Sequence, residues 1–266
     1  MSQQKISSSV ALVLQSTYEQ IEIGLLVNGQ LTAQVSLPKA IASSQILLVI
    51  DQLLRAQACQ ITDLQFIAAN LGPAPFTSLR VVIATVNGLG FATGIPLIGV
   101  NGLQAFVTEF ALDQRSLGTT LALLNAYNQD LYYGLLDQSG QFSSGWGKAV
   151  QLLPELAQQL RVAGVHQINL IGNGMSLFAA QIAQNFVGFT LVTATAGADP
   201  TQPITALELD LASALANFQA RQYCSLARVS QLAQQLYLDP ANHSTQLQPL
   251  YLKTVQVVVN KNYTGV

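Results

Sequence analysis

The sequence predicts an α/β protein made of two successive copies of one topology. Three observations carry this prediction. A hairpin signal, Asn28-Gly29, joins two segments of alternating hydrophobicity, the first hundred residues follow the order β-β-β-α-β-α-β, and a similar order returns after residue 118. Repetition of one unit indicates gene duplication, and a chain of 266 residues is long enough to form two cores.

The first copy begins with an apolar run that is typical of a buried strand, and the two hairpin segments follow it up to Pro38. Apolar residues, among them Ile46, Ile50 and Leu54, then return at helical spacing, and Thr93-Gly94 ends a second helical stretch. In chain order, the expected elements are strands at 10–14, 21–29 and 30–37, a helix at about 42–58, a strand at 64–70, a helix at about 79–92 and a strand at 95–100.

The second copy contains the same kinds of segment in a similar order. We expect strands at 118–127, 130–140 and 141–150, a helix at about 151–163, a strand at 168–174, a helix at about 175–186 and a strand at 189–194. Further helices are expected near 205–219 and 225–237, followed by the apolar tail LQPLYLKTVQVVV.

The composition restricts the possible functions. Half of the residues are apolar and only 9% are charged, against about 25% in an average soluble domain. Such a chain must bury unusually much surface or leave apolar patches for a partner. Its net charge is −2 and its eleven Lys and Arg are scattered singly, so we expect no basic track that could hold RNA directly.

Cysteine and histidine are too rare for several classes of site. Cys59 and Cys224 do not suggest a disulfide framework, and with only two histidines, His166 and His243, no close zinc-binding cluster can form. The apolar run near the start of the chain is too short for a signal peptide, so we expect a cytoplasmic protein.

The stretch from Val81 to Val100 is about as long as a membrane span. It contains four glycines and a proline and has no flanking aromatic or basic anchors, so we expect a helix followed by a strand rather than a span. Ala84, Gly88 and Ala92 lie four residues apart, which leaves one helix face almost bare. Glycine in a helix costs about 1 kcal/mol relative to alanine, so a packing partner is expected, either within the chain or in another subunit.

A nucleotide pocket would lie where the first strand ends and at two strand–loop–helix junctions. Gln15 stands where such a pocket needs an acidic side chain to hold magnesium through water, while Ser16 and Thr17 could still donate hydrogen bonds to phosphate. A simple polar turn without a ligand is the alternative explanation of these residues. The junctions LGPAPFTSLR (71–80) and IGNGMS (171–176) offer helix N-termini for an anion, with Thr77 or Ser78 as a possible N-cap of the first helix.

The first of these junctions and the helix after it carry a family signature. Gly72-Pro73-Ala74-Pro75-Phe76-Thr77-Ser78-Leu79-Arg80, followed by Ile83-Ala84-Thr85, Gly88-Leu89, Ile95-Pro96 and Gly99-Val100, resembles the G-P-G-S-F-T-G-L-R signature and the I-A-T-x-x-G-L pattern of the TsaB family. The segments LVLQST, LLNAYNQDLYYGL, LIGNG and LQPLYLK keep the order of that family. The resemblance covers nearly the whole chain.

The resemblance implies an architecture. TsaB (YeaZ-like) proteins have two actin/Hsp70-like (ASKHA, RNase H-like) subdomains, each a mixed five-stranded sheet with flanking helices. In this chain the N-terminal subdomain would span 1–104 and carry the partner-binding helices, and the C-terminal subdomain would span 105–266 with extra helices.

The resemblance also implies a function in tRNA modification. TsaB-like proteins are not themselves the catalyst. They pair with a TsaD-type transferase and a TsaE-type ATPase to attach threonylcarbamoyl to the adenosine next to the anticodon, and they also form homodimers. The tRNA would therefore be met indirectly, through the complex, and ATP or ADP with magnesium would belong to the complex rather than to this chain alone.

The family's contact surface lies on the helices at 42–58 and 79–92 of this chain. The partner or dimer interface is expected at Ser44, Leu47, Asp51, Ala84, Gly88, Phe91 and Ala92. A vestigial nucleotide pocket is expected at Gln15, Ser16, Thr17, Gly72, Gly172 and Gly174.

Several positions depart from the family pattern and weaken the case for a working pocket. Gln15 replaces the usual Asp, Ser43-Ser44 replaces His-Ser, and Asn125-Ala126-Tyr127 replaces Asp-Ala-Arg. Two alternatives stay open: an ATP-dependent small-molecule kinase or peptidase-like enzyme of the same superfold, and a self-associating structural protein that ignores TsaD.

Overall fold

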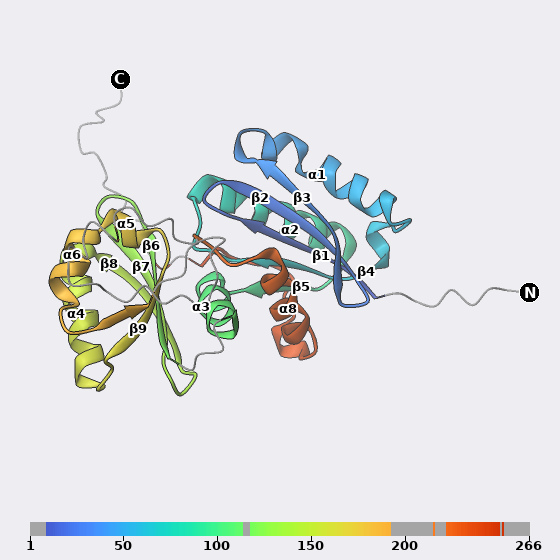
Figure 1. Cartoon of the computed structure of the whole chain (residues 1–266). Coiled ribbons are helices and arrows are strands. Elements are labelled where there is room, and N and C mark those ends of the chain that lie inside the picture. The colour runs from blue at the N-terminus through green and yellow to red at the C-terminus, as the bar shows by residue number, and fades with distance from the viewer. Residues whose placement is uncertain (1–8, 114–117, 193–214, 216–221, 251, 253–266) are drawn as a thin grey trace, which may run out of the picture.

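The computed structural model describes residues 9–113, 118–192, 215, 222–250 and 252. Within these ranges the chain forms two five-stranded sheets, each with three antiparallel strands followed by two parallel ones (Figure 1). The helix expected near 205–219 and most of the apolar tail lie outside the described residues.

The first sheet has the strand order β3-β2-β1-β4-β5. Asn28 and Gly29 have φ angles of 51° and 78° in the turn between β2 and β3, so the hairpin prediction is confirmed. One face of the sheet is covered by α1 and α2, which also contact each other. The elements are β1 (Val10–Ser16), β2 (Gln20–Val27), β3 (Gln30–Pro38), α1 (Lys39–Ala56), η1 (Ile61–Asp63), β4 (Leu64–Asn70), α2 (Phe76–Thr93) and β5 (Leu97–Val100).

The second sheet repeats this plan in the order β10-β9-β6-β7-β8. Its elements are β6 (Thr119–Asn125), β7 (Asp130–Leu136), β8 (Phe142–Lys148), α4 (Ala149–Val162), β9 (Gln167–Ile171), α5 (Gly174–Leu177), α6 (Ala179–Asn185) and β10 (Thr190–Val192). The single helix expected at 175–186 is wrong in one respect, because Phe178, with φ −121° and ψ 28°, interrupts it and separates α5 from α6.

Two further helices pack against the sheets and against each other. These are α3 (Gly102–Asp113), which contacts β6 and β7, and α8 (Leu226–Tyr237), which contacts the first sheet and α3 (Figure 1). The sequence analysis missed α3 altogether, although Asn101 is an N-cap residue whose side chain accepts hydrogen bonds from the backbone N–H groups of Leu103 and Gln104. A shared hydrophobic core, drawn from both sheets, α3 and α8, joins the two halves.

The α/β fold with duplicated, mixed five-stranded sheets is therefore confirmed, and its strand plan is the one that the actin/Hsp70-like resemblance implies. The subdomain limits of 1–104 and 105–266 stay predictions. The helix α8 follows the second sheet in the sequence, yet it packs on the first sheet, so chain order and spatial grouping differ here.

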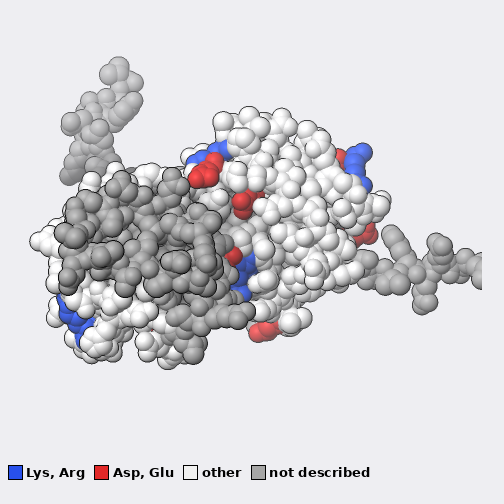
Figure 2. Space-filling view, viewed as in Figure 1, with Lys and Arg blue, Asp and Glu red and all other residues white. Residues whose placement is uncertain are grey.

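The surface and the helices bear on the question of a membrane. Figure 2 shows few charged residues on the described part of one face of the molecule, and several of them lie beside a residue of opposite charge. Among the described helices, α2 alone is long and apolar enough to cross a membrane by length and composition. A third of its residues are buried inside the protein, and it packs on β1, β4 and α1. A helix that covers a sheet passes the same test of length and composition.

Candidate functional site

The helix α2 is held by its surroundings more than by its own sequence. It starts after Pro75 without a side-chain cap, so the expectation that Thr77 or Ser78 caps it is wrong. The Ser78 hydroxyl instead donates to the Pro75 carbonyl at 3.1 Å. At the other end Gly94 adopts the left-handed conformation, φ 71°, which closes the helix as the sequence predicts.

The glycines Gly88 and Gly90 of this helix face opposite environments. A Cβ atom added to Gly90 would lie 2.7 Å from Leu97 Cδ2 on β5, so this glycine lets the helix approach its own sheet closely. A Cβ atom added to Gly88 would meet no atom of the described residues within 4 Å. Gly90 therefore has a packing partner within the chain, whereas the external partner expected at Gly88 stays a prediction.

The helix face around Gly88 forms a ridge of small residues with one large knob. Ala84, Gly88 and Ala92 are exposed, and the Phe91 side chain beside them is 92% exposed. We call these four residues the α2 ridge. The neighbouring α1 contributes further exposed apolar side chains, including Leu47, which is 58% exposed. All residues expected at the interface are exposed: Ser44, Leu47, Asp51, Ala84, Gly88, Phe91 and Ala92.

A groove separates the C-terminal half of α1 from α2. It encloses a cavity of about 490 Å³. Leu47, Leu54 and Leu89 give it an apolar lining, and Asp51 and Arg55 form an ion pair of 2.8 Å at its rim. Two of the expected interface residues, Leu47 and Asp51, therefore line a concave surface next to the convex α2 ridge, and such a pair of shapes suits a protein partner.

The predicted nucleotide pocket has a different character, because its polar groups bond to one another. Gln15 is fully buried, and its Nε2 donates to Glu22 Oε2 at 2.5 Å and to the Cys224 carbonyl at 3.2 Å. Its Oε1 accepts a hydrogen bond from Asn70 Nδ2 at 3.1 Å. The segment just before α8 thus contacts the end of β1 through the Cys224 carbonyl. This is the position where Gln15 stands in place of a carboxylate that could hold magnesium.

Ser16 and Thr17 are also buried and engaged. The Ser16 hydroxyl donates to Ser78 Oγ at 2.8 Å, which ties the end of β1 to the first turn of α2. The Thr17 Oγ1 atom accepts from the backbone N–H groups of Glu19 and Gln20 and donates to the Gln20 carbonyl, so it shapes the turn into β2. The polar-turn interpretation accounts for these contacts without a ligand.

The three glycines of the expected pocket are needed for close packing. Gly72 and Gly172 have φ angles of 100° and 101°, which favour glycine. Added Cβ atoms would lie 2.9 Å from Leu79 Cδ2 at Gly72, and 2.2 Å and 2.9 Å from the Leu123 carbonyl oxygen at Gly172 and Gly174. Their role as a vestigial nucleotide pocket stays a prediction.

Tyr18 connects the two halves at the edge of this region. Its hydroxyl donates to the Asn125 carbonyl at 2.8 Å, between the end of β1 and the end of β6. Burial raises the pKa of Tyr18 well above its ordinary value, and the nearby Tyr127 and Tyr132 add to that rise. The phenol therefore stays protonated and remains a hydrogen-bond donor.

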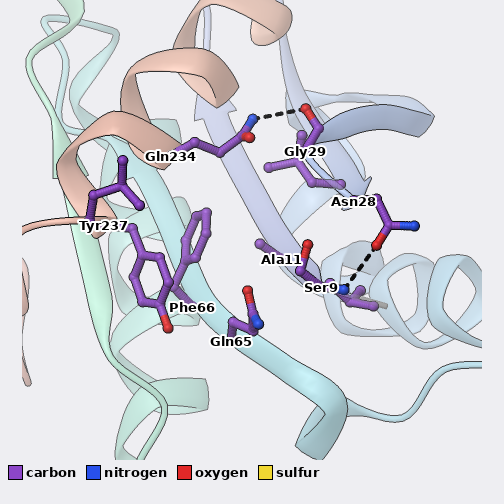
Figure 3. A pocket seen from close by; sticks show the side chains of 11 residues that line it. Ser9, Ala11, Asn28, Gly29, Gln65, Phe66, Gln234 and Tyr237 are labelled. Carbon is purple, nitrogen blue, oxygen red and sulfur yellow. Dashed lines mark hydrogen bonds between the residues drawn. The ribbon is translucent and has the colours of Figure 1, made fainter. Parts of the chain in front are cut away.

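A second cavity, of about 320 Å³, lies at the opposite end of β1, beside the C-terminal end of α8 (Figure 3). Its lining contains amide and aromatic side chains and no charged residue, and Gln234 Nε2 donates to the Gly29 carbonyl across it at 3.1 Å. None of the residues of the predicted pocket lines this cavity or the α1–α2 groove.

Within the described ranges, no cluster of three or more His, Cys, Asp or Glu side chains could hold a metal ion. Glu22, the carboxylate closest to Gln15, receives its hydrogen bonds from the amides of Gln15 and Gln20. No local motif in the sequence connects Glu22, Asn70 or the Cys224 carbonyl with Gln15.

Comparisons with known proteins agree with the resemblance. The family model for tRNA N6-adenosine threonylcarbamoyltransferase (TsaD) matches residues 40–259. The tRNA threonylcarbamoyladenosine biosynthesis protein TsaB of Escherichia coli is 25% identical over 150 residues, 56% of this chain and 64% of that protein. The TsaB protein of Haemophilus influenzae is 25% identical over 122 residues, 46% of this chain and 51% of that protein. The chain thus spans about half to two thirds of the length of these curated relatives.

A solved structure supports the fold. The crystal structure of a Pseudomonas aeruginosa protein with similarity to peptidase YEAZ superposes with a TM-score of 0.64 and 18% identity, covering 92% of this chain and all of that chain. The family model covers more than half of this chain, which therefore belongs to the tRNA N6-adenosine threonylcarbamoyltransferase family, and within it to the TsaB (YeaZ-like) proteins.

Proposed function

We propose that this chain is a noncatalytic dimerisation and activating subunit in tRNA threonylcarbamoyladenosine synthesis. In this role it pairs with a TsaD-type transferase that modifies the adenosine next to the anticodon. The names of the TsaB relatives and of the matching family model support the pathway. The exposed α2 ridge supports the role of a docking subunit.

The observation that carries the proposal is the open space in front of Gly88. Gly88 weakens the helix by about 1 kcal/mol relative to alanine and relieves no crowding against the part of the chain that the structure describes. A second helix laid across Ala84, Gly88 and Ala92 could approach the α2 backbone closely, with Phe91 as a hydrophobic anchor at its side. The groove between α1 and α2 would receive a protruding side chain of the partner.

The buried polar network supports a subunit that does not perform the chemistry. A phosphate group at the end of β1 would have to displace the hydrogen bonds that Gln15, Ser16 and Thr17 make to neighbouring residues. We therefore assign no catalytic residue and no cofactor to this chain alone. ATP or ADP with magnesium would bind in the assembled complex.

The further partners follow from the same assignment. A TsaE-type ATPase would join the complex, tRNA would be held mainly by the other subunits, and the protein would act in the cytoplasm. A homodimer through the α2 ridge would occupy the same face as TsaD. We also propose that the chain divides into an N-terminal subdomain, residues 1–104, which carries this face, and a C-terminal subdomain, residues 105–266.

The test is a pairing experiment with Gly88→Leu. The leucine side chain should fill the space where a partner helix would lie, while its higher helix propensity preserves the monomer. Light scattering and titration calorimetry with the TsaD-type protein of the same cell should show at least a tenfold loss of affinity. Ala180→Leu on α6, another exposed helical position, is the matched control and should pair normally. Equal pairing by wild type and Gly88→Leu would count against the proposal.

A further inference from the structure

A segment from the C-terminal part of the chain runs beside α2 on the side away from the sheet's first strands. We call residues 243–250 the C-terminal strap. Ser244 exchanges two backbone hydrogen bonds with Leu97 of β5, at 2.9 and 3.0 Å, and the Leu250 N–H donates to the Leu71 carbonyl at 2.8 Å. The strap therefore extends the edge of the first sheet and reaches the loop that precedes α2.

Between these two ends the strap is attached to α2 itself. Asn87 Nδ2 donates to the Leu247 carbonyl at 2.9 Å, and Asn87 Oδ1 accepts from the Leu247 N–H at 2.8 Å. The amide thus bonds a strap residue 160 positions away in the way that a neighbouring β-strand would. The Leu247 side chain is only 7% exposed and belongs to the core that α2 forms with the first sheet.

The strap is also anchored where it begins. The Tyr237 ring lies between the Phe66 ring and the His243 ring, with centroid distances of 4.6 and 4.9 Å. Figure 3 shows the Phe66 and Tyr237 side chains next to each other at one wall of the cavity. A hydrogen bond of 2.9 Å joins His243 Nε2 and the Tyr237 carbonyl. The first residue of the strap, His243, is thus held against the first sheet through Tyr237.

The strap contacts the C-terminal half of α2, which has the lower intrinsic helix propensity. Gly88, Gly90 and Gly94 all lie in or just after its C-terminal half, and glycine is a poor helix former. Asparagine inside a helix is also unfavourable unless its side chain has a bonding partner. Asn87 precedes Gly88 directly, so its two hydrogen bonds to Leu247 fix the backbone next to the α2 ridge.

We propose that the C-terminal strap holds the C-terminal half of α2 in the conformation that a partner subunit binds, with Asn87 as the positioning residue. The inference rests on the proposed function, because the binding event it concerns is docking of the TsaD-type partner. Asn87 acts through α2, so its removal lowers affinity by loosening the ridge.

The experiment compares Asn87→Ala with Asn242→Ala. Asn242 is a matched control, since its Nδ2 also bonds a backbone carbonyl, that of Leu236 at 3.0 Å, on the far side of the strap's start. Hydrogen exchange of the α2 amides should accelerate about tenfold in Asn87→Ala, the effect of losing two hydrogen bonds of ordinary strength. Affinity for the TsaD-type partner should fall roughly tenfold with it. Asn242→Ala should leave both quantities unchanged.

The possible results separate the two ideas. If the wild-type chain pairs and Asn87→Ala pairs equally, with unchanged exchange in α2, the inference is overturned and the proposed function stands. A wild-type chain that binds no TsaD-type partner overturns the proposed function, and the docking role of the strap with it. Should Asn87→Ala fail to fold, Asn87→Asp decides. It keeps an acceptor for the Leu247 N–H, but a charged oxygen replaces the donor and repels the Leu247 carbonyl, so affinity should fall; wild-type affinity would overturn the inference.

Discussion

Gly88 on α2 and Gly172 after β9 are both glycines in segments that the family signature marks, yet their surroundings are opposite. Gly88 has open space in front of it, whereas a Cβ atom on Gly172 would lie 2.2 Å from the Leu123 carbonyl oxygen. The structure of the chain itself explains why Gly172 must be glycine. Among the residues that the structure describes, it gives no such reason for Gly88, and this agrees with the proposal that a partner helix lies there.

A similar contrast separates the polar residues at the end of β1 from the apolar residues on α1 and α2. At the end of β1, Gln15, Ser16 and Thr17 make their hydrogen bonds to other residues of the chain. On α2 and α1, Phe91 and Leu47 leave most of their apolar surface in water. Buried polar groups with partners stabilise the fold, while a cluster of exposed apolar groups indicates a binding surface.

The largest expected effect comes from Gly172→Ala. The new methyl group would press on the β6 backbone and the residue would keep a left-handed φ, so we expect a loss of about 3–5 kcal/mol in the free energy of unfolding. Urea denaturation followed by circular dichroism measures it. The matched variant Gly88→Ala should instead gain about 0.5–1 kcal/mol, because alanine favours the helix. Similar changes in unfolding free energy in both variants would contradict the difference between the crowded surroundings of Gly172 and the open surroundings of Gly88.

The second prediction concerns Gln15→Glu, which keeps the shape of the side chain and adds a charge. Two carboxylates would then face each other where Gln15 Nε2 now donates to Glu22 at 2.5 Å. Unfolding free energy should fall by about 3 kcal/mol near neutral pH, since like charges in a buried site repel strongly.

The pH dependence has a definite sign. Each carboxylate raises the pKa of the other in the folded state above its value in the unfolded chain. Stability is then retained at low pH and lost as the pH rises through the raised pKa, so the deficit at about pH 8 should exceed that at about pH 5. The control is Gln20→Glu, which faces the Glu22 carboxylate from a half-buried position. It should lose less unfolding free energy than Gln15→Glu. A deficit that grows on acidification would contradict the expected repulsion.

The sequence was sufficient for most of the fold because its strongest signals are local. Alternating segments around Asn28-Gly29 and helical spacing along α1 define elements within ten or twenty residues. The small-residue face of α2 was also predictable, since the spacing of Ala84, Gly88 and Ala92 is a property of one helix, but this spacing did not decide whether the face is buried or exposed. The helix α3 was missed although its N-cap, Asn101, is visible in the sequence.

The remaining features depend on contacts between distant parts of the chain. Nothing near Gly90 in the sequence says that Leu97 fills the space before it, and nothing near Asn87 points to Leu247. The hydrogen bond from Gln15 to the Cys224 carbonyl spans 209 positions. Such pairings arise from the tertiary fold, so a single sequence could indicate an incomplete pocket but not what closes it.

The smallest effect is expected for Tyr18→Phe, at the boundary between the two halves. Removing the hydroxyl deletes its hydrogen bond to the Asn125 carbonyl, which should lower the unfolding free energy by about 1 kcal/mol at neutral pH. Because burial raises the pKa of Tyr18 in the folded state, the wild-type chain loses this contribution as the pH rises beyond the ordinary tyrosine range. The difference between wild type and Tyr18→Phe should therefore shrink in urea titrations at about pH 10.5, while the other tyrosines, present in both proteins, cancel. A difference that stays constant or grows at high pH would show that Tyr18 is not buried as a neutral donor. The contact between the ends of β1 and β6 would then be open to water.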